Sequence, residues 1–121
     1  MFGIFKNSGS ESSSYLTYVA LLTQTSTNDP EATVLENTLG GTPVWTRGVA
    51  GIYTCTLASA FPLSKTFVIN GLAPNGGFDF IAYTWMDSPP NSFRLTTIDI
   101  ATYTPLDGLL TSNPIEIRVY P

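Results

Sequence analysis

The 121-residue chain is 43% hydrophobic and only 12% charged, so it is long enough to bury one core without a disulfide or a structural metal. Its five cations are scattered and leave a net charge of −4, which argues against nucleic acid or an anionic membrane surface as a partner. The chain has no histidine, which removes serine–histidine and cysteine–histidine catalysis and the commonest metal ligand.

The first 14 residues predict a short anchor joined to a tether. Phe2, Ile4 and Phe5 make an apolar segment, and residues 7–14 are rich in serine and glycine, as in flexible linkers. The segment lacks the apolar stretch of a signal peptide, and no run approaches the ~18 apolar residues of a membrane span. We expect either a disordered start or a docking peptide for a neighbouring subunit, followed by one domain at residues 15–121.

Eight runs with strand character follow in chain order, separated by turns rich in glycine and proline. They lie at residues 15–25, 33–38, 44–47, 52–57, 66–70, 78–85, 93–100 and 115–120, with a long connection at 104–113. The first run, YLTYVALLTQT, is apolar on both faces, which favours a central strand with a partner over its outer side. The pattern predicts an all-β fold: a single β-sandwich or jelly-roll-like domain of about eight antiparallel strands.

Two strands carry more specific expectations. In the closing strand, Ile115, Ile117 and Val119 alternate with polar residues and are predicted to face the core. The opposite face is a candidate subunit contact, made of Glu116, Arg118 and Tyr120. Cys55 is the single cysteine, which excludes an internal disulfide, and its place in the alternation IYTCTL predicts a buried core residue without nucleophilic function.

The polar residues show no pattern of a catalytic or metal site. We interpret the nine carboxylates as solvated surface groups and Asp107-Gly108 as an ordinary turn, since no calcium-loop spacing occurs. Gly40-Gly41 and Gly76-Gly77 lack the following Gly-Lys-Ser/Thr and helix of a phosphate loop, so they also predict turns. We expect no enzyme activity, no cofactor and no metal.

The aromatic residues suggest one alternative role. Trp45, Trp85 and Tyr103, together with Tyr83, are candidates for stacking on sugar rings if they are exposed. The competing interpretation is that a sandwich core absorbs several of them.

A set of segments, specific together and weak singly, also points to known proteins. In chain order they are YVALLTQ (18–24), VLENTLGG (34–41), VWTR (44–47), GIYTCTL (51–57), AFPLSKTF (60–67) and DGLLTSNPIEIRVYP (107–121). With these segments in the same order, nearly all of residues 15–121 resembles small β-rich proteins of Bacteroidota and their phages. Some of those proteins resemble virion components such as tail or head fibres, so the resemblance implies a structural or host-contact role and carries no catalytic residue across.

The first hypothesis is therefore a non-enzymatic virion structural protein, capsid-associated or part of a spike or fibre, made in the host cytoplasm. Its expected partners are copies of itself, as a trimer by analogy with phage fibres, and other virion proteins. Residues 1–14 lie outside the resemblance, which fits a virion-specific anchor. The alternative is a carbohydrate-binding module that recognises a cell-surface glycan, a role that a virion spike can combine with the first.

Overall fold

The computed structural model describes residues 14–71 and 80–121, which form nine β-strands in two antiparallel sheets and contain no helix. The strands are β2 (Leu16–Thr23), β3 (Glu31–Asn37), β4 (Val44–Val49), β5 (Ile52–Thr56), β6 (Thr66–Asn70), β7 (Phe80–Ser88), β8 (Ser92–Asp99), β9 (Thr104–Pro105) and β10 (Asn113–Val119). This arrangement confirms the predicted all-β, sandwich-like fold.

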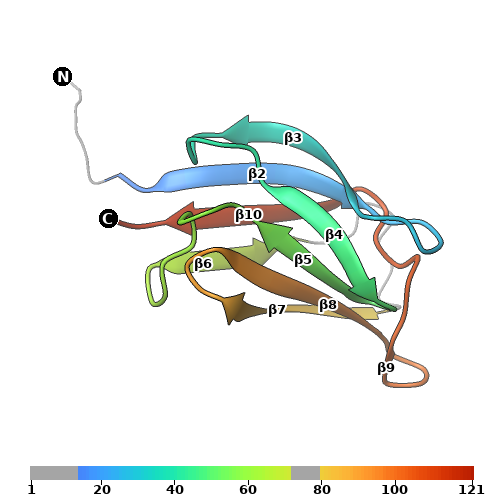
Figure 1. Cartoon of the computed structure of the whole chain (residues 1–121). Coiled ribbons are helices and arrows are strands. Elements are labelled where there is room, and N and C mark those ends of the chain that lie inside the picture. The colour runs from blue at the N-terminus through green and yellow to red at the C-terminus, as the bar shows by residue number, and fades with distance from the viewer. Residues whose placement is uncertain (1–13, 72–79) are drawn as a thin grey trace.

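The closing strand lies inside one sheet of the sandwich. The first sheet has the order β3-β2-β10-β6 and the second the order β4-β5-β8-β7, with β9 also paired to β8. In β10, Ile117 pairs with Tyr18 of β2 on one side and with Val68 of β6 on the other. Figure 1 shows the start of β2 and the C-terminus at one end of the sandwich, and the β8–β9 turn at the opposite end.

Strand alternation builds the core between the sheets. Ile115, Ile117 and Val119 of β10 are buried, while the residues between them are partly exposed, so the predicted inner face of the closing strand is confirmed. Cys55 is fully buried in β5, as predicted, and burial raises the pKa of its thiol. Each fully buried apolar side chain contributes roughly 1.5–3 kcal/mol, so this inner layer supplies the main stabilisation of the fold.

The first strand is buried on one face and half-covered on the other. Tyr18, Ala20 and Leu22 of β2 point into the core with at most 1% of their surface exposed. The outward Val19 and Leu21 are only partly buried. The structure therefore confirms that the inner face of β2 is apolar and buried. That a partner covers its outer face stays a prediction.

The short strand β9 was missed in the predicted connection at 104–113. Thr104 and Pro105 pair with Asp99 and Ile98 of β8, and the Leu106 N–H donates to the Thr97 carbonyl at 3.1 Å. Two residues, one of them a proline without an N–H, are too few to show an alternating pattern. The predicted strand at 78–85 also runs on to residue 88, where pairing with β8 continues across a bulge. The turn predicted at Gly76-Gly77 lies outside the described residues.

Candidate functional site

Trp45, one of the predicted stacking residues, belongs to the core. It is 6% exposed on β4, its indole Nε1 lies 3.3 Å from the Tyr18 hydroxyl, and its ring meets Phe93 edge-on with centroids 5.8 Å apart. The prediction that Trp45 could offer a ring to a sugar is therefore corrected. The alternation in VWTR places Trp45 and Arg47 on one face of the strand. That this face points inward follows from the contact of Trp45 with Tyr18 of the first sheet.

Trp85 lies on the outer face of the second sheet. Because Phe80, Ala82 and Met86 pack against the core, the alternating residues of β7 point outward, and Trp85 retains 40% exposure. Its indole N–H donates to the Thr96 hydroxyl of β8 at 3.0 Å. Tyr83, two residues earlier on the same face, is 45% exposed. We call this surface, made of Ile81, Tyr83, Trp85 and Arg94, the Trp85 face.

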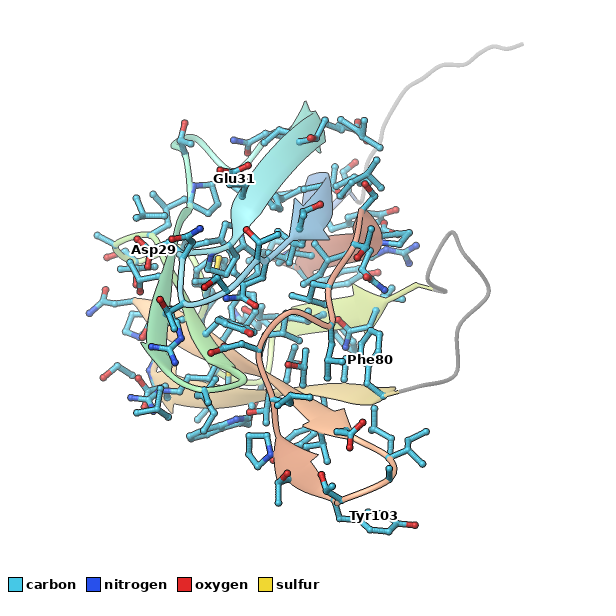
Figure 2. All side chains as sticks on the ribbon, turned by 90° about the vertical axis from the view of Figure 1, so that its right-hand side faces the viewer. Asp29, Glu31, Phe80 and Tyr103 are labelled. Atoms are coloured by element: carbon cyan, nitrogen blue, oxygen red, sulfur yellow. The ribbon has the colours of Figure 1, made fainter. Side chains whose placement is uncertain are left out.

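Tyr103 is the most exposed of the predicted aromatic residues, at 74%, and belongs to a different part of the molecule. Figure 2 shows it at the tip of the β8–β9 turn, pointing away from the sandwich. Trp85 pairs with Arg94, whereas the Tyr103 N–H bonds to the Asp99 carbonyl five residues further along β8. At ~3.3 Å per residue, the two positions are about 16 Å apart along the strand, so they do not form one site.

The outer face of the first sheet carries an aromatic cluster. The Tyr120 ring lies 5.1 Å from the Tyr15 ring and 5.4 Å from the Phe67 ring, between centroids. Phe67 and Ile69 of β6 are 55% and 44% exposed. We call this surface, made of Tyr15, Phe67, Ile69 and Tyr120 with the Glu116–Arg118 pair, the Phe67 face.

The Phe67 face includes the predicted outward residues of the closing strand. Arg118 pairs with Glu116 at 2.8 Å, and its guanidinium carbon lies 5.0 Å from the centre of the Tyr15 ring. The hydrogen bond to Glu116 is the main reason that the pKa of Arg118 lies above its ordinary value. The structure therefore brings Glu116, Arg118 and Tyr120 together on one outward surface; their role as a subunit contact stays a prediction. Phe2, Ile4 and Phe5 lie outside the described residues.

Asp107 corrects the interpretation of the carboxylates as solvated groups. Its Oδ2 accepts hydrogen bonds from Arg47 Nη2 at 2.8 Å and Nε at 3.0 Å, and its Oδ1 accepts the Gly51 N–H at 3.0 Å and lies 2.8 Å from the Tyr53 hydroxyl. Partial burial acts to raise the pKa of Asp107, but these donors outweigh it and hold the pKa below its ordinary value of 3.8. Asp107-Gly108 thus lies at the centre of a group of polar contacts across the sandwich, and we call this group the clamp.

Gln24 completes this clamp at the end of β2. It is 1% exposed, and its Oε1 accepts the Gly108 N–H and lies 2.8 Å from the Tyr53 hydroxyl. Its amide nitrogen donates to the carbonyls of Ser26 and Asn28, both at 3.0 Å. The signal that sequence reasoning missed is that Gln24 continues the inward series of Tyr18, Ala20 and Leu22. Because hydrogen-bond donors surround both carboxylate oxygens of Asp107, the clamp fixes the loops and leaves Asp107 without a free oxygen to act as a general acid or base.

Within residues 14–71 and 80–121, no cluster of three or more histidine, cysteine, aspartate or glutamate side chains has metal-binding geometry. The described segments also contain no helix that is long and apolar enough to cross a membrane. No family model, curated protein or solved structure matches the chain.

Proposed function

We propose that the chain is a non-enzymatic structural subunit of a phage virion, capsid-associated or part of a spike or fibre, that assembles with copies of itself. The observation that carries the proposal is the Phe67 face, an outward sheet surface with exposed aromatic and apolar side chains. Contiguous exposed apolar surface in a protein of low charge is typical of a protein interface. Aromatic residues and arginine are also enriched in such interfaces, and this face contains both.

The geometry of the Phe67 face suits a self-associating contact. Its charged side chains, Glu116 and Arg118, already neutralise each other, so burial of the face leaves no isolated charge between subunits. Phe67 lies on β6, an edge strand of the first sheet, beside the central strand β10. A neighbouring copy can therefore approach over the face without displacing the core. We propose a trimer as the assembly.

Light scattering of the purified full chain tests self-association. The expected result is a mass that is a multiple of 13.1 kDa, threefold for a trimer. In Phe67→Ser the measured mass should shift towards that of a single chain. Val44→Ser is the matched control, because Val44 is similarly exposed at 57% but lies on the other sheet. A wild-type chain that stays monomeric across a concentration series contradicts the proposed assembly.

The N-terminal segment has the role of an anchor in this proposal. Phe2, Ile4 and Phe5 attach the subunit to the particle, and residues 7–14 give the sandwich its reach. Deletion of residues 1–14 is expected to leave the folded sandwich and its oligomer intact but to abolish incorporation into particles. Incorporation of the deleted chain at wild-type copy number contradicts the anchoring role without touching the proposal of self-association.

A further inference from the structure

The inner layer of the sandwich reaches the solvent along one side, between β6 and β7. Each of these strands stands at the end of its own sheet. Thr66 and Val68 of β6 face inward, because they pair with buried residues of β10, yet both remain partly exposed. Thr84 and Met86 of β7 face inward for the same reason, opposite buried residues of β8, and are also partly exposed. The two edge strands therefore leave an opening into the core.

A small pocket lies at this opening. It has a volume of about 150 Å³ and is lined by the four inward side chains, by the fully buried Phe93, and by Trp85, whose own ring lies on the outer face against Thr96. Sites for drug-sized ligands are about 300–1,000 Å³, whereas a cavity of about 150 Å³ holds one benzene ring. The pocket therefore has the volume of a single phenylalanine ring.

The lining of the pocket favours an apolar occupant. Among the described residues, none that lines it carries a charge, and the Thr66 hydroxyl already donates to the Pro62 carbonyl at 2.9 Å. Phe93 meets the rings of Trp45 and Phe61 edge-on, with centroids 5.8 and 5.1 Å away, so a ring in the pocket would extend an aromatic cluster. The thioether of Met86 also makes favourable contacts with aromatic rings.

The chain carries phenylalanines close to this opening. Leu16, at the start of β2, pairs with Val119, which pairs in turn with Thr66 of the pocket. Two strand spacings place Leu16 about 10 Å from Thr66. Figure 1 shows the start of β2 at the end of the sandwich where β6 begins and β7 ends. The residues that precede β2 therefore enter the fold beside the pocket.

The preceding residues are long enough to bring a ring back to the pocket. Phe2 and Phe5 lie outside the described residues, and the sequence joins them to β2 through residues 7–14, which are rich in serine and glycine. The chain from Phe5 to Tyr15 spans up to about 36 Å when extended, more than three times the distance from Leu16 to Thr66.

We infer that one phenylalanine ring of the N-terminal segment, Phe2 or Phe5, occupies this pocket in its own chain. A short tether keeps the ring at a local concentration of the order of millimolar, so the chain's own segment outcompetes that of a neighbouring copy. The contact also covers an apolar side chain that would otherwise be exposed to water. The inference rests on the proposed anchor only for its setting: the anchor stays covered until the particle binds it.

Methyl NMR of the full chain tests the contact, because Met1 and Met86 are the two methionines of the sequence. Labelling the methionine methyl groups with ¹³C gives one signal from the segment and one from the pocket. The ring current of the bound phenylalanine should displace the Met86 signal. Either Phe2→Ser or Phe5→Ser is expected to shift this signal, and the double variant should shift it by the same amount. Phe67→Ser, which removes an outward ring from β6, is the control and should leave the Met86 signal in place.

Benzene provides an independent probe of the same pocket. In the double variant, benzene should shift the Met86 signal and saturate it. In the wild type about tenfold more benzene should be needed, as expected if the chain's own ring fills the pocket for about nine tenths of the time. Phe67→Ser should need as much benzene as the wild type.

Three results overturn the inference. The first is a Met86 signal that does not change in the double variant, and the second is equal benzene affinity in the double variant and the wild type. The third is recovery of the wild-type Met86 signal when unlabelled wild-type chain is added to the labelled double variant, because the ring would then come from a neighbouring copy. Light scattering separates this contact from the proposed assembly: a monomer whose Met86 signal responds as expected refutes the assembly alone.

Discussion

Substitution of Asp107 by asparagine perturbs the clamp with almost no change in shape. The carboxylate takes both nitrogen donors of Arg47 on one oxygen, and the two side chains are only 16% and 23% exposed. The amide of Asp107→Asn has one acceptor oxygen, so either the guanidinium or the Gly51 and Tyr53 donors must face an NH₂ group. The change therefore removes a charge and opposes donors to donors.

The expected cost is about 3 kcal/mol. A charge-assisted hydrogen bond contributes roughly 1.5–3 kcal/mol, and breaking a buried ion pair costs roughly 3–5 kcal/mol. Because Asp107 and Arg47 keep some contact with solvent, the lower part of that range applies. For a domain of this length, such a loss lowers Tm by roughly 10 °C.

Urea unfolding at a protein concentration at which the chain is monomeric measures this loss, because association through the Phe67 face, which contains the control residue Glu116, would otherwise add to the apparent stability. Glu116→Gln is the matched control: it breaks an ion pair of equal length, 2.8 Å, whose side chains are 30% and 35% exposed. Its expected cost is at most about 1 kcal/mol. Equal losses in Asp107→Asn and Glu116→Gln would refute the reasoning that burial and shared donors make the clamp the stronger pair.

Three further outcomes are expected. The pKa of Asp107 is lower in the folded chain, so the stability it contributes is complete above about pH 4 and is lost as the pH falls through the folded pKa; urea unfolding from pH 6 to pH 2 should show this loss in the wild type and a flatter profile in Asp107→Asn. Gly51→Ala should lower the stability measured by thermal unfolding by roughly 2–3 kcal/mol, because Gly51 has a φ of +71° and an added Cβ would lie 2.4 Å from the Leu106 nitrogen. Gly108→Ala should cost only about 1 kcal/mol, because Gly108 has a φ of +80° but an added Cβ would meet nothing within 4 Å. Similar costs for the two variants would contradict the close approach at Gly51. The Cys55 thiol should resist alkylation in the folded chain and react at the rate of unfolding, and rapid labelling of native protein would show that Cys55 is not sealed in the core.

Local pattern was enough to predict most of the fold. Alternation in residues 115–120 identified the inner face of β10, and the strand predicted at residues 66–70 has the bounds of β6. The alternation of residues does not show which face of a strand points into the core, and the packing of the sheets determines this. The face of β4 that holds Trp45 is inward because it packs against Tyr18 of the first sheet, a contact that the sequence VWTR alone does not reveal.

The clamp escaped prediction because it joins distant parts of the chain. Arg47 and Asp107 are 60 residues apart in sequence, and an aspartate before a glycine has the local signature of a turn. Gln24 was the one polar residue with a usable signal, since it follows the inward alternation of β2. Trp85 was named from its residue type, but its place on the outer face of the second sheet depends on the pairing of β7 with β8.

Mass spectrometry of phage particles purified from cells that produce this chain tests the central claim most directly. The account predicts peptides from residues 15–121 in density-purified particles, at a copy number that is constant between preparations and in proportion to the other structural proteins. Absence of the chain from particles, while it is abundant in the infected-cell lysate, would contradict a role as a virion subunit.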